Sequence, residues 1–290
     1  MNHRVVAYAP AKLNLALAVG AIQGNGLHPI ASRMVSVDLY DDLELRVLPT
    51  GSLSRFATLW HDDALRTSTI DWAFGSDLTA QAHRAVEETV GRTLPIQSTL
   101  RKRIPVGGGL GGGSSDAAAM LHGLNTLFDL ALSLDELADL GATLGADVPF
   151  LVRGGHAFVE GTGEQCSPLP LDDNLNFVLV FPEVACPTRL IFSAFDNQPM
   201  TVFEDERAKT ESFNDLAAPA YASFPDLKRD KDALETLVQT PVLLSGSGST
   251  LFLECDEAIN AQRHATTIRE TLNLPAIAVQ RCSGVAIERQ

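Results

Sequence analysis

Hydrophobic residues occupy every second position near the start of the chain. Leucine and valine alternate there with Lys12, Asn14 and alanines, a period of two that predicts a β-strand over residues 5–19 with a break at Pro10. Lys12 and Asn14 fall on the same face of this strand, because side chains two residues apart point the same way. Residues 34–47 predict one or two further strands, so the N-terminal part of the chain is rich in β-structure.

The pattern then changes to a helical period. Apolar residues at i and i+4 predict a helix over residues 78–90, and a basic, extended segment follows at 95–104. Beyond it, apolar residues recur at i, i+4, i+7 and i+8 up to Phe128, which predicts one buried face of a further helix. Ser114 or Ser115 is the expected N-cap of that helix.

A third helix is bounded by its own capping signals. Ser133 and Glu136 form a capping-box pattern, and Gly145 is the expected stop. Asp147 lies just past that stop, and Pro149 prevents the helix from continuing. The pattern predicts a tight exit from the helix that gives the Asp147 carboxylate a defined position.

The second half of the chain has a different composition. Proline, aspartate and asparagine accumulate after about Gly161, which predicts a domain boundary and the division into domains 1–165 and 166–290. Predicted elements follow as a strand at 177–181, helices at 188–195, 214–221 and 231–239, strands at 242–244 and 251–254, a helix at 256–272 and a strand at 276–281. This order favours an α+β sandwich of the ferredoxin-like kind.

Composition and charge exclude several classes of protein. The 290 residues are 45% hydrophobic and carry a net charge of -14, which disfavours binding to nucleic acids or anionic membranes. No apolar run approaches the roughly 20 residues of a membrane helix, and we expect a cytoplasmic protein without a removable segment. The four cysteines lack Cys-x-x-Cys spacing and the seven histidines lack His-x-x-x-His spacing, so neither a disulfide framework nor a dedicated zinc site is expected.

Six of the seven residues from Gly107 to Gly113 are glycine, directly before a predicted helix. Backbone N–H groups of such a loop can approach an anion without obstruction by a Cβ atom, and the helix N-terminus favours negative charge. A flexible linker is the alternative, but a linker is not expected between a strand and a strongly periodic helix. The Walker A and Rossmann patterns are absent. The loop therefore predicts a phosphate site of another class.

Four segments together resemble the GHMP kinase family. "PVGGGLGGGSSDAAA" is similar to its second signature, "APAKLNLALAV" to its first motif, "LGADVPFLVRGGHAFVEGTGE" to the stretch with its catalytic aspartate, and "LLSGSGSTLFLE" to its third motif. The resemblance implies an α+β fold of two domains. These are an N-terminal ATP-binding and catalytic domain like domain 2 of ribosomal protein S5 and a ferredoxin-like C-terminal domain. The triple-glycine form looks most like the branch that phosphorylates the 2-hydroxyl of a cytidine-diphosphate-linked methylerythritol in non-mevalonate isoprenoid biosynthesis.

The resemblance also implies roles for individual residues. Asp147 would accept the hydroxyl proton, and Lys12 would hold Asp147 ionised and polarise the attacking oxygen. Phosphoryl transfer needs mainly alignment and charge stabilisation, so these parts suffice. Taken alone, Asp147 is better explained as a helix-exit cap and Lys12 as an exposed strand lysine, but the four motifs together outweigh those explanations. The implied ATP-binding residues are Pro105, Val106, Gly107, Gly108, Gly109, Leu110, Gly111, Gly112, Gly113, Ser114 and Ser115.

The substrate side of the resemblance departs from the family at one position. "GNGLHPI" keeps His28, but Leu27 stands where the family has a tyrosine that stacks on cytosine. Leucine can cover a base face yet loses the aromatic stacking contribution, roughly 0.5 to 1.5 kcal/mol. Phe192, in "CPTRLIF", matches a second stacking aromatic. The implied substrate-binding residues are Asn14, Leu27, His28, Phe192, Gly246, Ser247 and Gly248.

Magnesium is expected with ATP, and the sequence specifies no dedicated ligand, although Ser115 is the candidate that the family suggests. Leu27 leaves open another GHMP small-molecule kinase, such as a homoserine or mevalonate-type kinase. A catalytically silent binding protein of the same fold is a third possibility. The presence of both Lys12 and Asp147 argues against it. The adenine pocket is expected within residues 50–78, and the oligomeric state is expected to be a monomer or weak homodimer.

Overall fold

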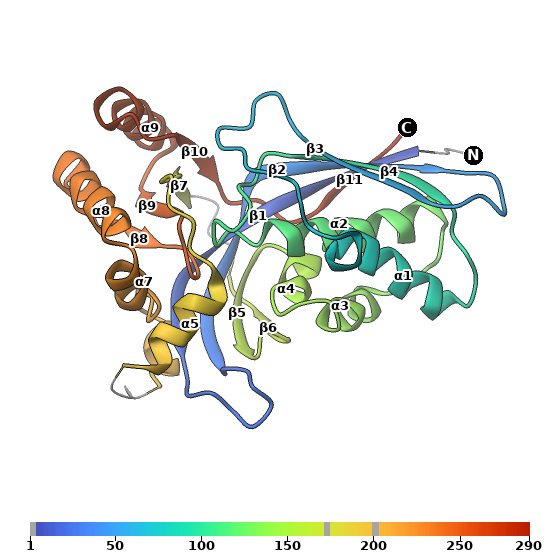
Figure 1. Cartoon of the computed structure of the whole chain (residues 1–290), viewed down its shortest axis with the longest axis horizontal. Helices are drawn as coiled ribbons and strands as arrows, with labels where there is room; N and C mark the ends of the chain where they lie inside the picture. Colours follow the sequence, from blue (N-terminus) through green and yellow to red (C-terminus); the bar gives the residue numbers. More distant parts are fainter. Residues whose placement is uncertain (1–3, 171–174, 199–202) are drawn as a thin grey trace.

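The computed structural model describes residues 4–170, 175–198 and 203–290. Two β-sheets lie in the described chain, and most helices cover one face of one or the other (Figure 1). The strands are β1 (Arg4–Val19), β2 (Ile30–Val47), β3 (Arg55–Trp60), β4 (Ile96–Lys102), β5 (His156–Gly161), β6 (Gln165–Pro168), β7 (Asn176–Val180), β8 (Leu243–Leu244), β9 (Leu251–Cys255), β10 (Ala276–Gln280) and β11 (Ala286–Arg289).

Helices connect many of these strands and pack on the two sheets (Figure 1). They are η1 (Phe74–Ser76), α1 (Leu78–Val90), α2 (Gly112–Leu127), α3 (Leu134–Ala142), α4 (Val148–Arg153), α5 (Thr188–Asp196), α6 (Asp205–Ala208), α7 (Ala217–Ser223), α8 (Pro225–Val238) and α9 (Ala258–Leu272). No helix in these described ranges is long and apolar enough to cross a membrane.

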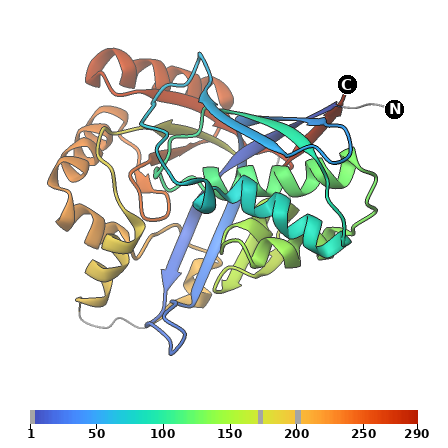
Figure 2. The ribbon, with the colours of Figure 1, turned by 45° about the vertical axis from the view of Figure 1, so that its right-hand side comes forward.

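The first sheet has the strand order β11-β1-β2-β4-β3, with β5 pairing on β2 and β6 on β5. Strands β1 and β2 form a long antiparallel pair that runs from one end of the molecule to the other (Figure 2). Strand β3 pairs with β4 in parallel, a strand that the sequence pattern did not reveal. This sheet carries α1 to α4 on one face (Figure 1).

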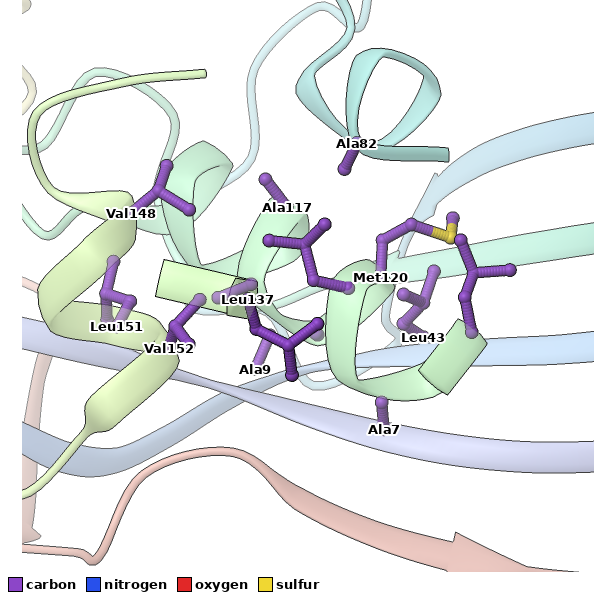
Figure 3. Packing of buried hydrophobic residues seen from close by; sticks show 14 of the residues in the cluster. Ala7, Ala9, Leu43, Ala82, Ala117, Met120, Leu137, Val148, Leu151 and Val152 are labelled. Carbon is purple, nitrogen blue, oxygen red and sulfur yellow. The ribbon is translucent and has the colours of Figure 1, made fainter. Parts of the chain in front are cut away.

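Helix α2 packs in the centre of that layer. Its small residues let it approach the sheet closely: a Cβ atom on Gly123 would lie 2.6 Å from Cδ1 of Leu45. Around it, side chains from the sheet, α1, α3 and α4 form a buried cluster, and Met120 is fully buried among them (Figure 3). The hydrophobic packing therefore holds the start of α2 in a fixed place relative to β1.

The second sheet confirms the ferredoxin-like expectation. Its order is β10-β7-β9-β8 with antiparallel neighbours, and the elements follow one another as strand, helices, two strands, helix and strand. Strands β8 and β9 form a hairpin whose turn is the glycine–serine loop 245–250. Helix α9 packs on β7 and β10.

Side chains from both sheets share one core. Leu13 and Val37 of the first sheet pack in one buried cluster with Phe177 and Phe252 of the second. The final strand β11 returns to pair with β1, so the first sheet contains residues from both ends of the described chain. The division of the chain at residue 165 stays a prediction, and the shared core holds the two sheets together.

Candidate active site

Lys12 and Asn14 lie side by side on β1, as the alternation predicted. The buried Lys12 Nζ donates a hydrogen bond of 2.6 Å to Asn14 Oδ1, and Asn14 Nδ2 donates to Ser32 Oγ at 2.9 Å. Ser32 Oγ in turn donates to the backbone carbonyl of Ala16. This chain of hydrogen bonds fixes the rotamers of both side chains. Lys12 Nζ also forms an ion pair with Asp147, at 3.4 Å from its Oδ2.

Asp147 precedes a helix, whereas the sequence pattern predicted only a tight exit. Helix α3 ends at Ala142, and the Ser133–Glu136 capping box that begins it is confirmed. Pro149 does not end a helix here: it occupies the first turn of α4, where its missing N–H group costs nothing. Asp147 is the residue before α4 and makes no capping hydrogen bond, so its carboxylate, which is 29% exposed, faces Lys12.

The glycine run forms a loop that leads straight into α2. Gly107, Gly109 and Gly111 all have φ between +68° and +75°, a region that favours glycine. The serine-cap prediction was wrong, since α2 begins at Gly112 with Gly111 as its N-cap residue and no side-chain cap. Ser115 is fully buried, and its Oγ donates to the carbonyl of Pro10 at 2.6 Å.

The loop 245–250 packs directly on the glycine loop. Ser245 Oγ donates to the carbonyl of Gly109 at 3.0 Å, and the backbone N–H of Thr250 donates to the carbonyl of Gly108 at 3.1 Å. The fit is close enough that a Cβ atom on Gly109 would lie 2.1 Å from the Ser245 carbonyl oxygen. The hairpin of the second sheet thus sets the shape of the glycine loop.

A second cluster surrounds His28. Its Nδ1 lies 2.9 Å from the carbonyl oxygen of Gly20, so this nitrogen carries a hydrogen, and its Nε2 lies 3.5 Å from Asp196 Oδ1. The His28 and Phe192 rings are 5.0 Å apart between centroids. Leu27 is 52% exposed beside them. The sequence did not reveal Asp196, because α5 brings it to His28 from a distant part of the chain.

One cavity of about 1170 Å³ joins these features. Most of the sequence-predicted residues line it, namely Lys12, Asn14, Leu27, His28, Pro105, Val106, Gly107, Gly108, Gly109, Leu110, Gly111, Gly112, Gly113, Ser114, Asp147, Phe192, Gly246 and Ser247. Ser115 and Gly248 are outside this lining. The Gly248 backbone packs on Leu244, and Ser247 Oγ lies 2.9 Å from Thr188 Oγ1.

Sequence reasoning missed a buried ionic cluster beneath the glycine loop. Lys102 Nζ donates to Asp41 Oδ2 at 2.5 Å and to Asp116 Oδ2 at 2.6 Å, and all three residues are buried. Asp41 also accepts backbone hydrogen bonds from Arg103 and Ile104. Asp116 Oδ1 has no hydrogen-bond partner among the described residues.

The two carboxylates in this cluster are therefore unequal. Burial raises the pKa of Asp116 well above its ordinary value, and the nearby charge of Asp41 adds to that effect while Lys102 opposes it. Burial by itself would lower the pKa of Lys102, but the two carboxylates outweigh it and raise that pKa. Lys102 thus stays charged, and the folded Asp116 carboxylate binds a proton more tightly than an ordinary aspartate does. No group of three His, Cys, Asp or Glu residues in the described part of the chain could hold a metal ion.

Comparison with known proteins agrees with this fold. The family description "GHMP kinases N terminal domain" matches residues 77–155, which include the glycine loop, α2 and Asp147. A crystal structure of homoserine kinase from Cytophaga hutchinsonii superimposes with a TM-score of 0.75 over 99% of this chain and 98% of its own, at 17% identity. At that identity the likeness concerns the fold, which is that of the GHMP kinases.

Other relatives are considerably more similar in sequence. The 4-diphosphocytidyl-2-C-methyl-D-erythritol kinase of Azoarcus sp. (strain BH72) is 37% identical over 260 residues, 87% of this chain and 86% of its own. That of Pseudomonas syringae pv. tomato is 36% identical over 93% of this chain and 92% of its own. A crystal structure of 4-(cytidine 5'-diphospho)-2C-methyl-D-erythritol kinase, 31% identical, covers 96% of this chain and 100% of its own with a TM-score of 0.75. The chain belongs to the 4-diphosphocytidyl-2-C-methyl-D-erythritol kinase family of the GHMP kinases.

Proposed function

We propose that this chain transfers the terminal phosphoryl group of ATP to the 2-hydroxyl of 4-diphosphocytidyl-2-C-methyl-D-erythritol, a step of non-mevalonate isoprenoid precursor biosynthesis. The observation that carries the proposal is the ion pair between Lys12 and Asp147 in the wall of the cavity that the glycine loop also lines. Similarity to relatives of that name over most of the chain supports the choice of substrate.

The proposed chemistry uses two side chains. Asp147 accepts the proton of the attacking hydroxyl, since its carboxylate is partly exposed in the cavity wall and makes no capping hydrogen bond. Lys12 supplies a fixed positive charge 3.4 Å away that stabilises the carboxylate and the attacking oxygen. Asn14 and Ser32 hold the lysine in place.

The glycine loop is the proposed cradle for the triphosphate. The loop with its alternate positive φ values and the start of α2 both line the cavity, and backbone N–H groups at a helix N-terminus favour an anion. Local N–H donors of this kind can bind an anion although the chain as a whole carries a net charge of -14. Residues 105–115 are the proposed ATP-binding segment, although Ser115 uses its hydroxyl on the Pro10 carbonyl and its backbone N–H on the Gly111 carbonyl.

Magnesium is proposed to accompany ATP, where it would neutralise charge between the phosphate oxygens. The described residues offer no preformed cage of three ligands, which suits an ion held largely by the nucleotide itself. Asp147 and Asp116 are the aspartates in the wall next to the glycine loop that could assist, and Ser115 uses its hydroxyl on Pro10.

The base of the acceptor is proposed to lie against His28 and Phe192. The two rings lie 5.0 Å apart beside Leu27, and Gly246 and Ser247 line the same cavity. A Cβ atom on Gly246 would lie 3.3 Å from Asn14 Oδ1 and 3.6 Å from Lys12 Nζ, which supports the proposal that this loop contacts the acceptor diphosphate. A cytoplasmic location, a monomer or weak homodimer, and domains 1–165 and 166–290 remain predictions.

Release of ADP with a panel of acceptors tests the proposal. We expect turnover with the cytidyl substrate, and mass spectrometry should find one added phosphate on its 2-hydroxyl. Turnover of homoserine or mevalonate without turnover of the cytidyl substrate would instead assign the chain another acceptor, as the replacement of the stacking tyrosine by Leu27 could allow. Binding of ATP and the acceptor without any turnover would indicate a silent binding protein.

A further inference from the structure

The segment from His61 to Asp77 crosses from the first sheet to the second and back. Arg66 donates hydrogen bonds to the backbone carbonyls of Pro182, Glu183 and Val184, next to the second sheet. Trp60 Nε1 donates to the carbonyl of Ser68 at 2.7 Å. These contacts hold a segment that contains no strand and only the short helix η1 in place beside the cavity.

Trp72, from this segment, lines the cavity and is half-buried. Its indole Nε1 already donates to Asp77 Oδ2 at 3.1 Å, and Asp77 Oδ1 caps α1 by accepting from the N–H groups of Thr79 and Ala80. The hydrogen-bonding atom of the ring is thus occupied within the protein. What Trp72 offers to the cavity is its aromatic surface.

Two further apolar residues of the cavity lining, Leu78 and Val106, adjoin the glycine loop. Leu78 lies within contact of the start of α2, since a Cβ atom on Gly113 would be 3.7 Å from Leu78 Cδ1. Pro105 and Val106 line the cavity just before the glycines, and Val106 is 44% exposed. Leu78 and Val106 therefore offer apolar surface next to the proposed triphosphate cradle, and Trp72, held by Asp77 directly before Leu78, lines the same cavity.

A flat, aromatic group covalently attached to a triphosphate is the ligand that such a surface fits. The acceptor's base is proposed to lie against His28, in the loop before β2, and Phe192 of α5, a helix that packs against α7. Helix α1, by contrast, packs beside α2, so the two aromatic surfaces belong to different parts of the fold (Figure 1). We propose that Trp72 is the stacking wall for the nucleobase of the phosphoryl donor, an inference that rests on the proposed kinase function.

Calorimetric titration of the full chain with ATP and, separately, with inorganic triphosphate tests this role. Stacking of a base on an aromatic ring predicts that W72A raises the Kd for ATP roughly five- to 150-fold, while W72F keeps most of the affinity. Inorganic triphosphate has no base, so its Kd should be the same for the wild type and W72A. In steady-state kinetics W72A should raise KM for ATP and leave KM for the acceptor unchanged. ATP should also quench the fluorescence of the wild type more than that of W72F.

Phe74 provides a matched control on the same segment. It is 57% exposed, packs edge-on against Phe56 and does not line the cavity, so F74A should bind ATP as the wild type does. Equal affinity of W72A and wild type for ATP would overturn the proposal, as would an equal loss of affinity for ATP and for inorganic triphosphate, which would indicate a merely structural role. If the wild type turns over and W72A is unchanged, only the Trp72 proposal fails. If the wild type binds no nucleoside triphosphate, the kinase function itself fails.

Discussion

Lys12 Nζ lies 3.4 Å from Oδ2 of Asp147, although 134 residues of chain separate them. The lysine is buried on β1 and held by Asn14, whereas the aspartate is partly exposed at the start of α4. The positive charge of Lys12 thus has a fixed position, whereas the carboxylate of Asp147 is accessible to a ligand. Such an arrangement suits a base that must exchange a proton with a ligand while a neighbouring cation stays still.

Replacement of Asp147 by asparagine tests its role as the base. D147N keeps the shape of the side chain and removes its basicity, so we expect kcat to fall by roughly 10²- to 10⁴-fold. The Kd for ATP should change little, because the glycine loop is intact. The exposed Asp135, paired with Arg153 outside the cavity, gives the control D135N, which should retain full activity. Wild-type kcat in D147N would remove Asp147 from the mechanism.

Leu27 is expected to limit affinity for the acceptor. Because the side chain is 52% exposed beside His28 and Phe192, a larger ring can be accommodated there. L27Y should lower KM for the cytidyl substrate by roughly two- to twelvefold through the added stacking, with KM for ATP unchanged. L53Y, at an 85% exposed position away from the cavity, should have no effect. An unchanged or higher KM in L27Y would mean that the base does not reach this position.

Gly107 and Gly109 have different surroundings, so we expect their replacement by alanine to lower the free energy of unfolding by different amounts. In G107A the new Cβ atom has no other atom within 4 Å. Only the strain of an alanine at a φ of +69° lowers the free energy of unfolding, by about 1 to 2 kcal/mol. G109A has a similar φ, and its Cβ would also lie 2.1 Å from the Ser245 carbonyl oxygen. We expect about 1 to 3 kcal/mol more loss in G109A, measured by urea unfolding, and a higher KM for ATP. Equal losses in the two variants would show that the contact between the loops does not stabilise the fold.

The Lys102 cluster predicts a dependence of stability on pH. Burial raises the pKa of Asp116 above its unfolded value, so the folded state binds the proton more tightly. Below the unfolded pKa both states are protonated; as pH rises through the window up to the folded pKa, the free energy of unfolding falls, by at most about 1.4 kcal/mol per pH unit.

D116N removes this titration while its amide oxygen can still accept from Lys102. The stability of D116N relative to the wild type should therefore increase with pH over that window, as measured by urea unfolding at several pH values. D135N controls for the loss of one exposed negative charge. A pH-independent difference between D116N and the wild type would show that Asp116 is ionised throughout.

Local signals in the sequence were sufficient for much of the site. The helix over residues 78–90 and the Ser133–Glu136 capping box are confirmed, because propensity, periodicity and capping all act within a few residues. The serine cap of α2 was wrong for a tertiary reason: Ser115 uses its hydroxyl on the Pro10 carbonyl, and a left-handed glycine begins the helix. The prediction that Pro149 ends a helix was likewise wrong, because proline is equally suited to the first turn of a helix, where Pro149 lies in α4.

By itself the sequence determined the strand that places Lys12 beside Asn14, the glycine loop before α2 and the motifs that indicate the family. Only the tertiary structure decided that Lys12 meets Asp147, that the loop 245–250 packs on the glycine loop, and that Asp41 and Asp116 share Lys102. It also brought Asp196 to His28 and Trp72 to the cavity. Periodicity and capping report neighbours along the chain, whereas these contacts join residues that only packing of the two sheets around one core brings within reach.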